Sequence, residues 1–474
     1  MKSEEIISVK PNRGYSHSNV YLNSLNLYIV NNRYRFKCRP IFKINVLPIE
    51  VNDMLIISKH LVTNRLAVRT ILLVWVLSCS LLSCNSYNSE FVEIKPIATH
   101  FNGMEYIGMQ SCVECHQDIV ESHKKTSHYK TSFETAASAF DEILKTQPNE
   151  INLKDGTKIV INKEGNKLFQ DFYVLNNPTP AYHTPMDITI GSGFRGQSFL
   201  YWNEDRLFQN QASIIGSMEG WINSPGYASR MNNTRPVVPR CMECHSTYTA
   251  PIASSTNRVN NEYDINNVLL GIDCQRCHGE VKEHVVFHKK NPEVKEGQHI
   301  LKYSELTQKQ RIDACALCHS GFRQPAWDPE ERKFIPSFSY QAGDDLDDFL
   351  LKSNNGSTNN SDPEIHANQI KLLTDSKCFK MSENMDCATC HDPHDQERGD
   401  FQNFSLKCIS CHQSQEHSQK TLSLAGANFN DCAACHMPFV DSKAMKIDLN
   451  LKELTPVRIR NHFISIYPEE NSLP

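Results

Sequence analysis

Cys112-Val-Glu-Cys-His116 is the first of seven Cys-x-x-Cys-His stretches in this chain of 474 residues. Two thiols three residues apart lie along one helical turn, where both can add to the vinyl groups of one porphyrin. The next residue then brings its imidazole to the iron. Each stretch therefore predicts one covalently bound haem c, and the chain is predicted to hold seven.

These motifs define the predicted site residues. The predicted thioether cysteines are Cys112, Cys115, Cys241, Cys244, Cys274, Cys277, Cys315, Cys318, Cys387, Cys390, Cys408, Cys411, Cys432 and Cys435. The predicted proximal iron ligands are His116, His245, His278, His319, His391, His412 and His436. Paired cysteines also ligate zinc, but a zinc site does not need a histidine after every pair. The pattern therefore favours haem over a set of zinc knuckles.

Four of the 18 cysteines lie outside the motifs: Cys38, Cys79, Cys84 and Cys378. Cys79 and Cys84 fall in a stretch that resembles an export signal, in which basic residues precede an apolar run at 71–82. That run is well short of the roughly 20 residues that cross a bilayer. Its end, Leu81-Leu82-Ser83-Cys84, resembles a bacterial lipobox, which predicts lipidation of Cys84. Cys378 is expected to be a buried thiol near the fifth haem.

The export signal begins far from Met1, although signal peptides are N-terminal. Met54 stands at the start of the basic stretch, so residues 1–53 are interpreted as an over-extended reading frame. The alternative is a cytoplasmic N-terminal tail before an uncleaved anchor. The predicted segments are the over-extended start (1–53), a lipoprotein-type signal peptide (54–83), a tether (84–105), a first haem segment (106–140), a β-rich haem-poor insert (141–239), haems 2–4 (240–340), a linker (341–376), haems 5–7 (377–440) and a C-terminal tail with a candidate distal histidine (441–474).

Composition restricts the fold and the partners. Only 39% of the residues are hydrophobic, so the porphyrins are expected to supply much of the core. The predicted fold class is a mainly α and irregular multihaem cytochrome c fold organised around haems, with a small β-rich insert. A net charge of −5 and a pI near 6.5 give no basic footprint for nucleic acid.

The segment 141–239 contains one histidine, His183, and is therefore haem-poor. Alternating apolar residues between turn residues predict strands at 151–153, 158–161 and 168–174. Gly191-Ser-Gly-Phe-Arg-Gly196 matches a dinucleotide-binding fingerprint, but the strand-like residues 197–202 follow where a helix is required. We therefore expect a tight turn and no nucleotide.

Each iron needs a sixth ligand, and its identity separates an electron carrier from an enzyme. Eleven further histidines follow Cys84: His100, His123, His128, His183, His284, His288, His299, His366, His394, His417 and His462. This number makes bis-histidine ligation of all seven irons feasible. His394 lies three residues after His391, too close in sequence to reach the far face of the same haem, so it is expected to serve a neighbour.

The residues around the motifs resemble the multihaem cytochrome c-552/c-554 family over roughly 105–465. The similarity includes Gly271-Ile-Asp-Cys-Gln-Arg-Cys-His-Gly279, Cys387-Ala-Thr-Cys-His-Asp-Pro-His394 and Cys432-Ala-Ala-Cys-His-Met-Pro438. The resemblance implies that His128, His284, His394 and His462 are distal ligands, and His183, His123 and His366 complete the candidates. Glu280-Val281 replaces the family's glycine-proline pair, and Asn461 replaces its aspartate.

We therefore expect an exported heptahaem cytochrome that transfers electrons and is not an enzyme, lipid-anchored on the periplasmic side or at the outer membrane. Its expected partners are redox proteins or quinol-linked membrane complexes. The alternative is a multihaem oxidoreductase acting on small nitrogen or sulfur compounds at one open haem. Cys-x-x-Cys-Lys is absent from the sequence, so a lysine-ligated catalytic haem is not expected. A haem-based sensor or a docking module formed by residues 141–239 is a third, less favoured class.

Overall fold

The computed structural model describes residues 94–216, 220–252, 259–352, 364–412, 417, 431–448 and 454–467. The chain divides into two units, Met1–Phe91 and Val92–Pro474, and every described residue belongs to the second. The predictions for the start at Met54, the signal peptide, Cys38, Cys79 and Cys84 lie outside the described residues. Within the described residues, no helix has the length and apolar character that a bilayer crossing requires.

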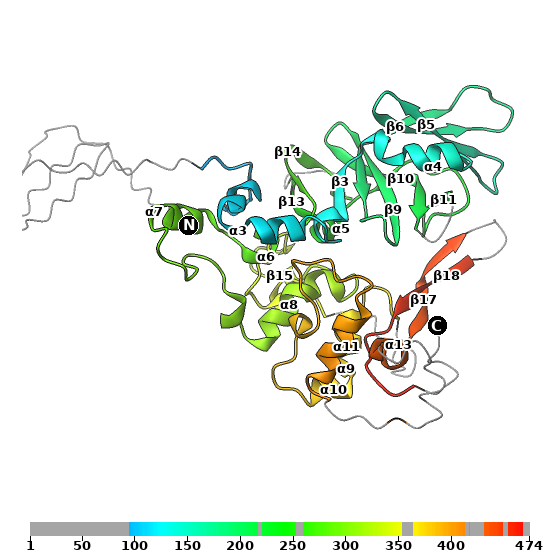
Figure 1. Ribbon diagram of the computed structural model, residues 1–474. Coiled ribbons are helices and arrows are strands. Elements are labelled where there is room, and N and C mark those ends of the chain that lie inside the picture. Colours follow the sequence, from blue (N-terminus) through cyan, green and yellow to red (C-terminus); the bar gives the residue numbers. More distant parts are fainter. Residues whose placement is uncertain are drawn as a thin grey trace, which may run out of the picture. The chain divides into compact units, whose positions relative to one another are not determined.

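Short helical elements contain five of the motifs and the first cysteine of the fifth and sixth motifs, and Figure 1 labels all of these elements except the one at the fifth motif. They are α3 (Gln110–His123), α5 (Pro239–His245), α6 (Cys274–His278), α8 (Gln308–His319), η5 (Cys387–Thr389), α11 (Phe401–Ile409) and α13 (Cys432–His436). The remaining helical elements are η1 (Tyr129–Thr131), η2 (Ala137–Phe140), α4 (Asp141–Thr146), α7 (Lys282–Lys290), η3 (Tyr303–Glu305), η4 (Leu346–Asp348), α9 (Gln369–Asp375) and α10 (Lys377–Lys380).

An aspartate placed directly before the first motif cysteine starts three of these helices. The side chains of Asp273, Asp386 and Asp431 each accept a hydrogen bond from a backbone N–H in the first turn. Such caps satisfy donors that have no partner inside the helix. They begin a helix where it is only long enough to carry the two cysteines and the histidine.

The haem-poor segment forms two antiparallel sheets. One has the order β11-β10-β9-β8-β3, with β12 paired to β10, and the other has the order β4-β5-β6-β7. Their bounds are β3 (Ser132–Glu134), β4 (Glu150–Asn152), β5 (Lys158–Glu164), β6 (Lys167–Tyr173), β7 (Tyr182–Met186), β8 (Ile188–Ile190), β9 (Gly196–Asn203), β10 (Arg206–Ile215), β11 (Trp221–Asn223) and β12 (Arg235–Pro236). β4, β5 and β6 occupy the three stretches that the sequence predicts as strands.

These sheets enclose a core of side chains. Its buried members are Ala137, Phe140, Ile151, Leu153, Ile159, Ile161, Leu168, Phe172, Met186, Phe199, Ala212 and Trp221. β9 follows Gly191–Gly196 directly, so this loop joins two strands and opens no helix. The loop therefore has the geometry of a tight turn and lacks that of a dinucleotide site.

Strands also occur outside the insert, in two-stranded antiparallel sheets. They are β1 (Ala98–Thr99) with β2 (Glu105–Tyr106), β13 (Ser246–Pro251) with β14 (Tyr263–Leu270), β15 (Trp327–Asp328) with β16 (Lys333–Phe334), and β17 (Phe439–Asp448) with β18 (Leu454–Arg460). The expected mainly α fold with a small insert thus underestimates the strands, which contain almost as many described residues as the helices. We expected the chain between the motifs to be irregular. In the structure, β13 directly follows α5, and the antiparallel strand β14 leads back toward α6.

Candidate haem sites

Hydrogen bonds at Nδ1 orient several histidine rings near the motifs. His284 Nδ1 lies 2.7 Å from the carbonyl oxygen of Gln298, His436 Nδ1 lies 2.9 Å from that of Ser465, and His462 Nδ1 lies 3.2 Å from that of Arg460. A histidine that donates Nδ1–H to a carbonyl keeps Nε2 as a free lone pair, the arrangement of a metal ligand.

Five motif histidines face a second histidine across a gap of nearly constant width. The ring centroids are 6.4 Å apart for His116 and His284, 6.1 Å for His278 and His394, 6.3 Å for His319 and His128, 6.4 Å for His391 and His462, and 6.3 Å for His436 and His417. A metal–imidazole bond of about 2 Å on each face, with each ring centre about 1 Å further, requires a gap of about 6 Å. The five gaps thus have the width that one shared iron would need.

Burial keeps two of these rings neutral. Burial is the largest cause that lowers the pKa of His319 and of His462 to about 4, and neighbouring histidines contribute to both shifts. A neutral imidazole is the form that binds a metal, because a protonated ring has no lone pair to give.

The structure brings together the four distal histidines that the family resemblance implies. His128, His284, His394 and His462 each face a motif histidine, although the residues before or after two of them depart from the family. His417, which is not among the seven favoured candidates, faces His436. One indication of this position was present in the sequence: His417 is one of the eleven histidines outside the motifs, and it lies between the last two motifs.

The other three candidates lie elsewhere. His183 is in β7, where its ring stacks on Phe169 at 4.2 Å and its Nδ1 lies 2.6 Å from Asp171 Oδ1. His366 is exposed beside Glu364. His123 is buried with its Nε2 2.8 Å from the carbonyl oxygen of Ile272, and its ring lies 6.3 Å from that of His394. Neither His183 nor His366 has a ring contact with a motif histidine among the described residues, so the structure pairs neither of them with one.

His245 differs from the five paired motif histidines. Its Nδ1 lies 3.0 Å from Thr131 Oγ1, and burial lowers its pKa. Among the described residues, no histidine ring faces it at the spacing of the five pairs. His412 ends the described stretch before residues 413–416.

Cysteines of different motifs contact one another. Thiols of different motifs lie next to one another in four pairs: Cys112 and Cys274, Cys244 and Cys318, Cys315 and Cys387, and Cys408 and Cys432. Weaker electrostatic interactions join Cys277 to Cys315 and Cys390 to Cys408. Cys378 interacts with Cys390, Cys408 and Cys411, and so lies beside the fifth and sixth motifs.

A buried ion network holds three motif helices together. Arg240 Nη1 lies 3.2 Å from Glu243 Oε2, and Arg276 Nη2 lies 3.9 Å from Glu243 Oε1. Arg240 Nη2 also donates to the carbonyl oxygen of Leu317 at 2.7 Å. Arg276 Nη2 donates to the carbonyl oxygen of Glu243 at 3.1 Å. α5, α6 and α8 are therefore joined by hydrogen bonds from charged groups, which are stronger than neutral ones.

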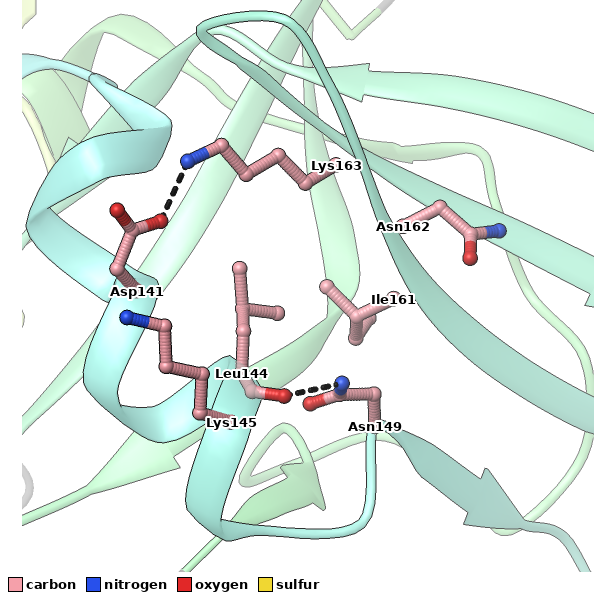
Figure 2. Close-up of a pocket in the computed structure, with 7 residues that line it drawn as sticks. All are labelled: Asp141, Leu144, Lys145, Asn149, Ile161, Asn162 and Lys163. Atoms are coloured by element: carbon pink, nitrogen blue, oxygen red, sulfur yellow. Dashed lines mark hydrogen bonds and ion pairs between the residues drawn. The ribbon is translucent and has the colours of Figure 1, made fainter.

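A cavity of about 410 Å³ lies away from the motifs, between α4 and β5. Figure 2 shows its lining: Lys163 reaches Asp141, at 2.5 Å, and Asn149 donates to the carbonyl oxygen of Leu144, at 2.8 Å. No cysteine or histidine is among its lining residues, so it offers no haem ligand.

The profile of the family described as cytochrome c554 and c-prime matches residues 217–279, which contain the second and third motifs. Residues 217–279 of this chain are therefore similar to the multihaem cytochromes c. This similarity implies covalently bound haem c, and the facing rings and paired cysteines fit that group. The solved structure of outer cell wall cytochrome OcwA is similar to this chain, with 14% identity and a TM-score of 0.47 over 76% of this chain and 79% of that chain. A comparison with curated proteins gives no match.

Proposed function

We propose that this cytochrome is an exported heptahaem electron carrier whose haems are mostly ligated by two histidines. The observation that carries the proposal is the set of five histidine pairs at 6.1–6.4 Å. An iron with imidazole on both faces has no position open to a substrate, so it exchanges electrons without changing its ligands. The protein's part is to hold the haems close together and to tune their potentials.

The thiol contacts support an order for the electron path. Each motif cysteine would carry the edge of its own haem, so two touching cysteines bring two haem edges together. The touching cysteines would join haem 1 to haem 3, haem 2 to haem 4, haem 4 to haem 5 and haem 6 to haem 7, and the weaker electrostatic interactions would link haem 3 to haem 4 and haem 5 to haem 6. The order that we propose is therefore haems 1, 3, 4, 5, 6 and 7, with haem 2 beside haem 4. Haem 4 is then a junction with three neighbours, and haem 2 is a branch.

The test combines a haem count with a spin-state measurement on protein matured in a cytochrome c-competent host. Pyridine haemochrome and intact mass should give seven haems per chain. His284→Ala should convert one low-spin haem to high spin in electron paramagnetic resonance, because the ring facing His116 is lost. His183→Ala is the matched control and should leave the spectrum unchanged. Five or fewer covalent haems, or no new high-spin signal in His284→Ala, would sink the proposal.

A second candidate function rests on His245. If haem 2 has only this histidine as an axial ligand, it would be open to small nitrogen or sulfur compounds, and the cytochrome would be a multihaem oxidoreductase. The discriminating measurement is the addition of nitrite or hydroxylamine to the oxidised protein. A stoichiometric high-spin haem that binds either compound and supports turnover favours this candidate over the carrier.

We propose export and lipid attachment from the sequence of residues 54–84. A chain starting at Met54 should mature normally, and Cys84→Ala should release haem-loaded protein from the membrane fraction. Retention of the Cys84→Ala protein on the membrane would contradict lipid attachment. The partners that we propose are redox proteins or quinol-linked membrane complexes. We do not propose that the protein binds nucleic acid or a nucleotide.

A further inference from the structure

The loop Gly191–Gly196 is tight and carries two exposed side chains, those of Phe194 and Arg195. Gly191 has φ of +106°, and a Cβ there would collide with the carbonyl oxygen of Gly196. A Cβ on Gly216 would likewise collide with the carbonyl oxygen of Phe194. Phe194 and Arg195 are both exposed. Only glycine fits this geometry, because its φ is unrestricted and it lacks a side chain.

Arg195 and Phe194 meet three arginines from the C-terminal half of the chain. The Arg398 guanidinium carbon lies 3.6 Å from the Phe194 ring centre, and Arg195 Nη1 donates to the carbonyl oxygen of Arg458 at 3.1 Å. The Arg460 guanidinium carbon lies 4.3 Å from the ring centre of Phe439, which Arg195 also approaches, at 6.0 Å. We call Arg195, Arg398, Arg458 and Arg460 the arginine patch.

The arginine patch has more positive than negative charge. Among the described residues, its one ion pair joins Arg458 Nε to Asp441 Oδ1 at 3.8 Å, and Asp431 also acts electrostatically on Arg460. Four cations and two carboxylates leave an excess of two positive charges. Burial, followed by repulsion from Arg195, lowers the pKa of Arg398. Gathered, partly desolvated cations are costly unless an anion neutralises them.

Arg460 of the patch acts electrostatically on His462, and the residue next to Arg398 lies beside His391, the other ring of that histidine pair. Glu397, next to Arg398, places Oε2 3.5 Å from His391 Nδ1. The carbonyl oxygen of Arg460 lies 3.2 Å from Nδ1 of His462, whose ring centre is 6.4 Å from that of His391. The chain segments that orient both rings therefore also carry two of the four arginines.

We propose that the arginine patch binds the propionate carboxylates of the haem held between His391 and His462, and thereby raises the reduction potential of that haem. This inference rests on the proposed function, which supplies a haem at this pair. Guanidinium groups bind carboxylates through charge-assisted and often bidentate hydrogen bonds. Neutralising the propionates removes negative charge beside the iron, and this makes the ferrous state relatively more stable.

The test uses the complete haem-loaded protein. Arg398→Gln/Arg460→Gln should keep the wild-type haem count while one low-spin haem shifts to a more negative potential in a potentiometric titration. Arg398→Lys/Arg460→Lys should restore most of the shift, because lysine keeps the charge. Arg195→Gln changes an exposed loop, so it provides a second test if the double variant folds poorly. It should shift the potential in the same direction by a smaller amount. Arg206→Gln, which removes an exposed arginine paired with Glu262, is the matched control and should give no shift.

Unchanged potentials in both glutamine variants would overturn the inference. Unchanged potentials together with a loss of salt-sensitive electron exchange with an acidic redox protein would overturn it as well, because the patch would then be a docking surface. Failure of the proposed function is distinguishable: the unaltered protein would then lack seven haems or a bis-histidine spectrum before any arginine is replaced.

Discussion

The haem-poor segment buries its large apolar side chains, whereas the segment with the last three motifs, which we call the C-terminal motif segment, leaves several of them exposed. The sheets of residues 132–236 enclose a core that includes Ile159, Leu168 and Phe172, all fully buried. In α11, by contrast, Phe401, Leu406 and Ile409 are 47%, 57% and 48% exposed. Side chains alone form the core of the first segment. We propose that the second segment uses the apolar porphyrin plates for its core.

The largest expected effect comes from removing a haem of the C-terminal segment. Cys408→Ala/Cys411→Ala should lose one haem and make residues 401–436 sensitive to limited proteolysis, because the porphyrin is part of the core there. The sheets should remain protected. Mass spectrometry of the fragments checks this, and a protease-resistant C-terminal segment without its haem would show that the two regions do not differ as described.

The next effect falls on the sheets. Phe172→Ala should cost about 3–5 kcal/mol of their free energy of unfolding, because a large buried ring is replaced by a cavity. The haem count should stay at its wild-type value, since the sheets hold no motif. Tyr182→Ala, at a ring that is 46% exposed, is the control. Denaturant unfolding and pyridine haemochrome give the two quantities, and loss of haem in Phe172→Ala would show that the regions depend on each other.

A helix cap gives a smaller effect within the motif regions. Thr307 caps α8 and shares reciprocal hydrogen bonds with Gln310. Thr307→Ala should cost about 1 kcal/mol of stability. The fourth haem should remain attached, because Cys315 and Cys318 are unchanged. Thermal unfolding checks the first statement and intact mass the second; loss of that haem would mean that the cap is needed for attachment.

The smallest effect concerns pH in the sheets. Burial raises the pKa of Asp187 above its ordinary value of 3.8, while its carboxylate accepts a hydrogen bond from the backbone N–H of Trp202. A carboxyl group with a raised pKa binds its proton more tightly in the folded state. Its contribution to stability is therefore present below pH 3.8 and is lost as pH rises through the raised pKa. Asp187→Asn should flatten that part of the stability curve in denaturant unfolding at several pH values, and an unaltered slope would refute the assignment.

The sequence predicted what depends on local chemistry. The seven motifs, the strands at 150–173 and the tight turn at Gly191–Gly196 all follow from short patterns of residues. The histidine pairs are different, because His128 and His319 are far apart in the sequence and meet only through packing. The family resemblance supplied four of the facing histidines, whereas His417 could not be chosen from the sequence among equivalent spare histidines.

The hairpins outside the insert were missed for a related reason. β17 and β18 lie in a stretch that was expected to be a tail, and they form because Ile447 packs with Ile215 and Ile222 of the haem-poor segment. The thiol contacts also join residues from separate motifs. Such long-range contacts leave no periodic signal within a short window of sequence.

The most direct test of the central claim is near-infrared magnetic circular dichroism of the oxidised, haem-loaded protein, because this spectrum reports the axial ligands of low-spin haem. The account predicts bis-histidine signals for at least five haems per chain, one for each facing pair. A spectrum in which most haems are high-spin, or have a ligand other than a second histidine, would contradict it.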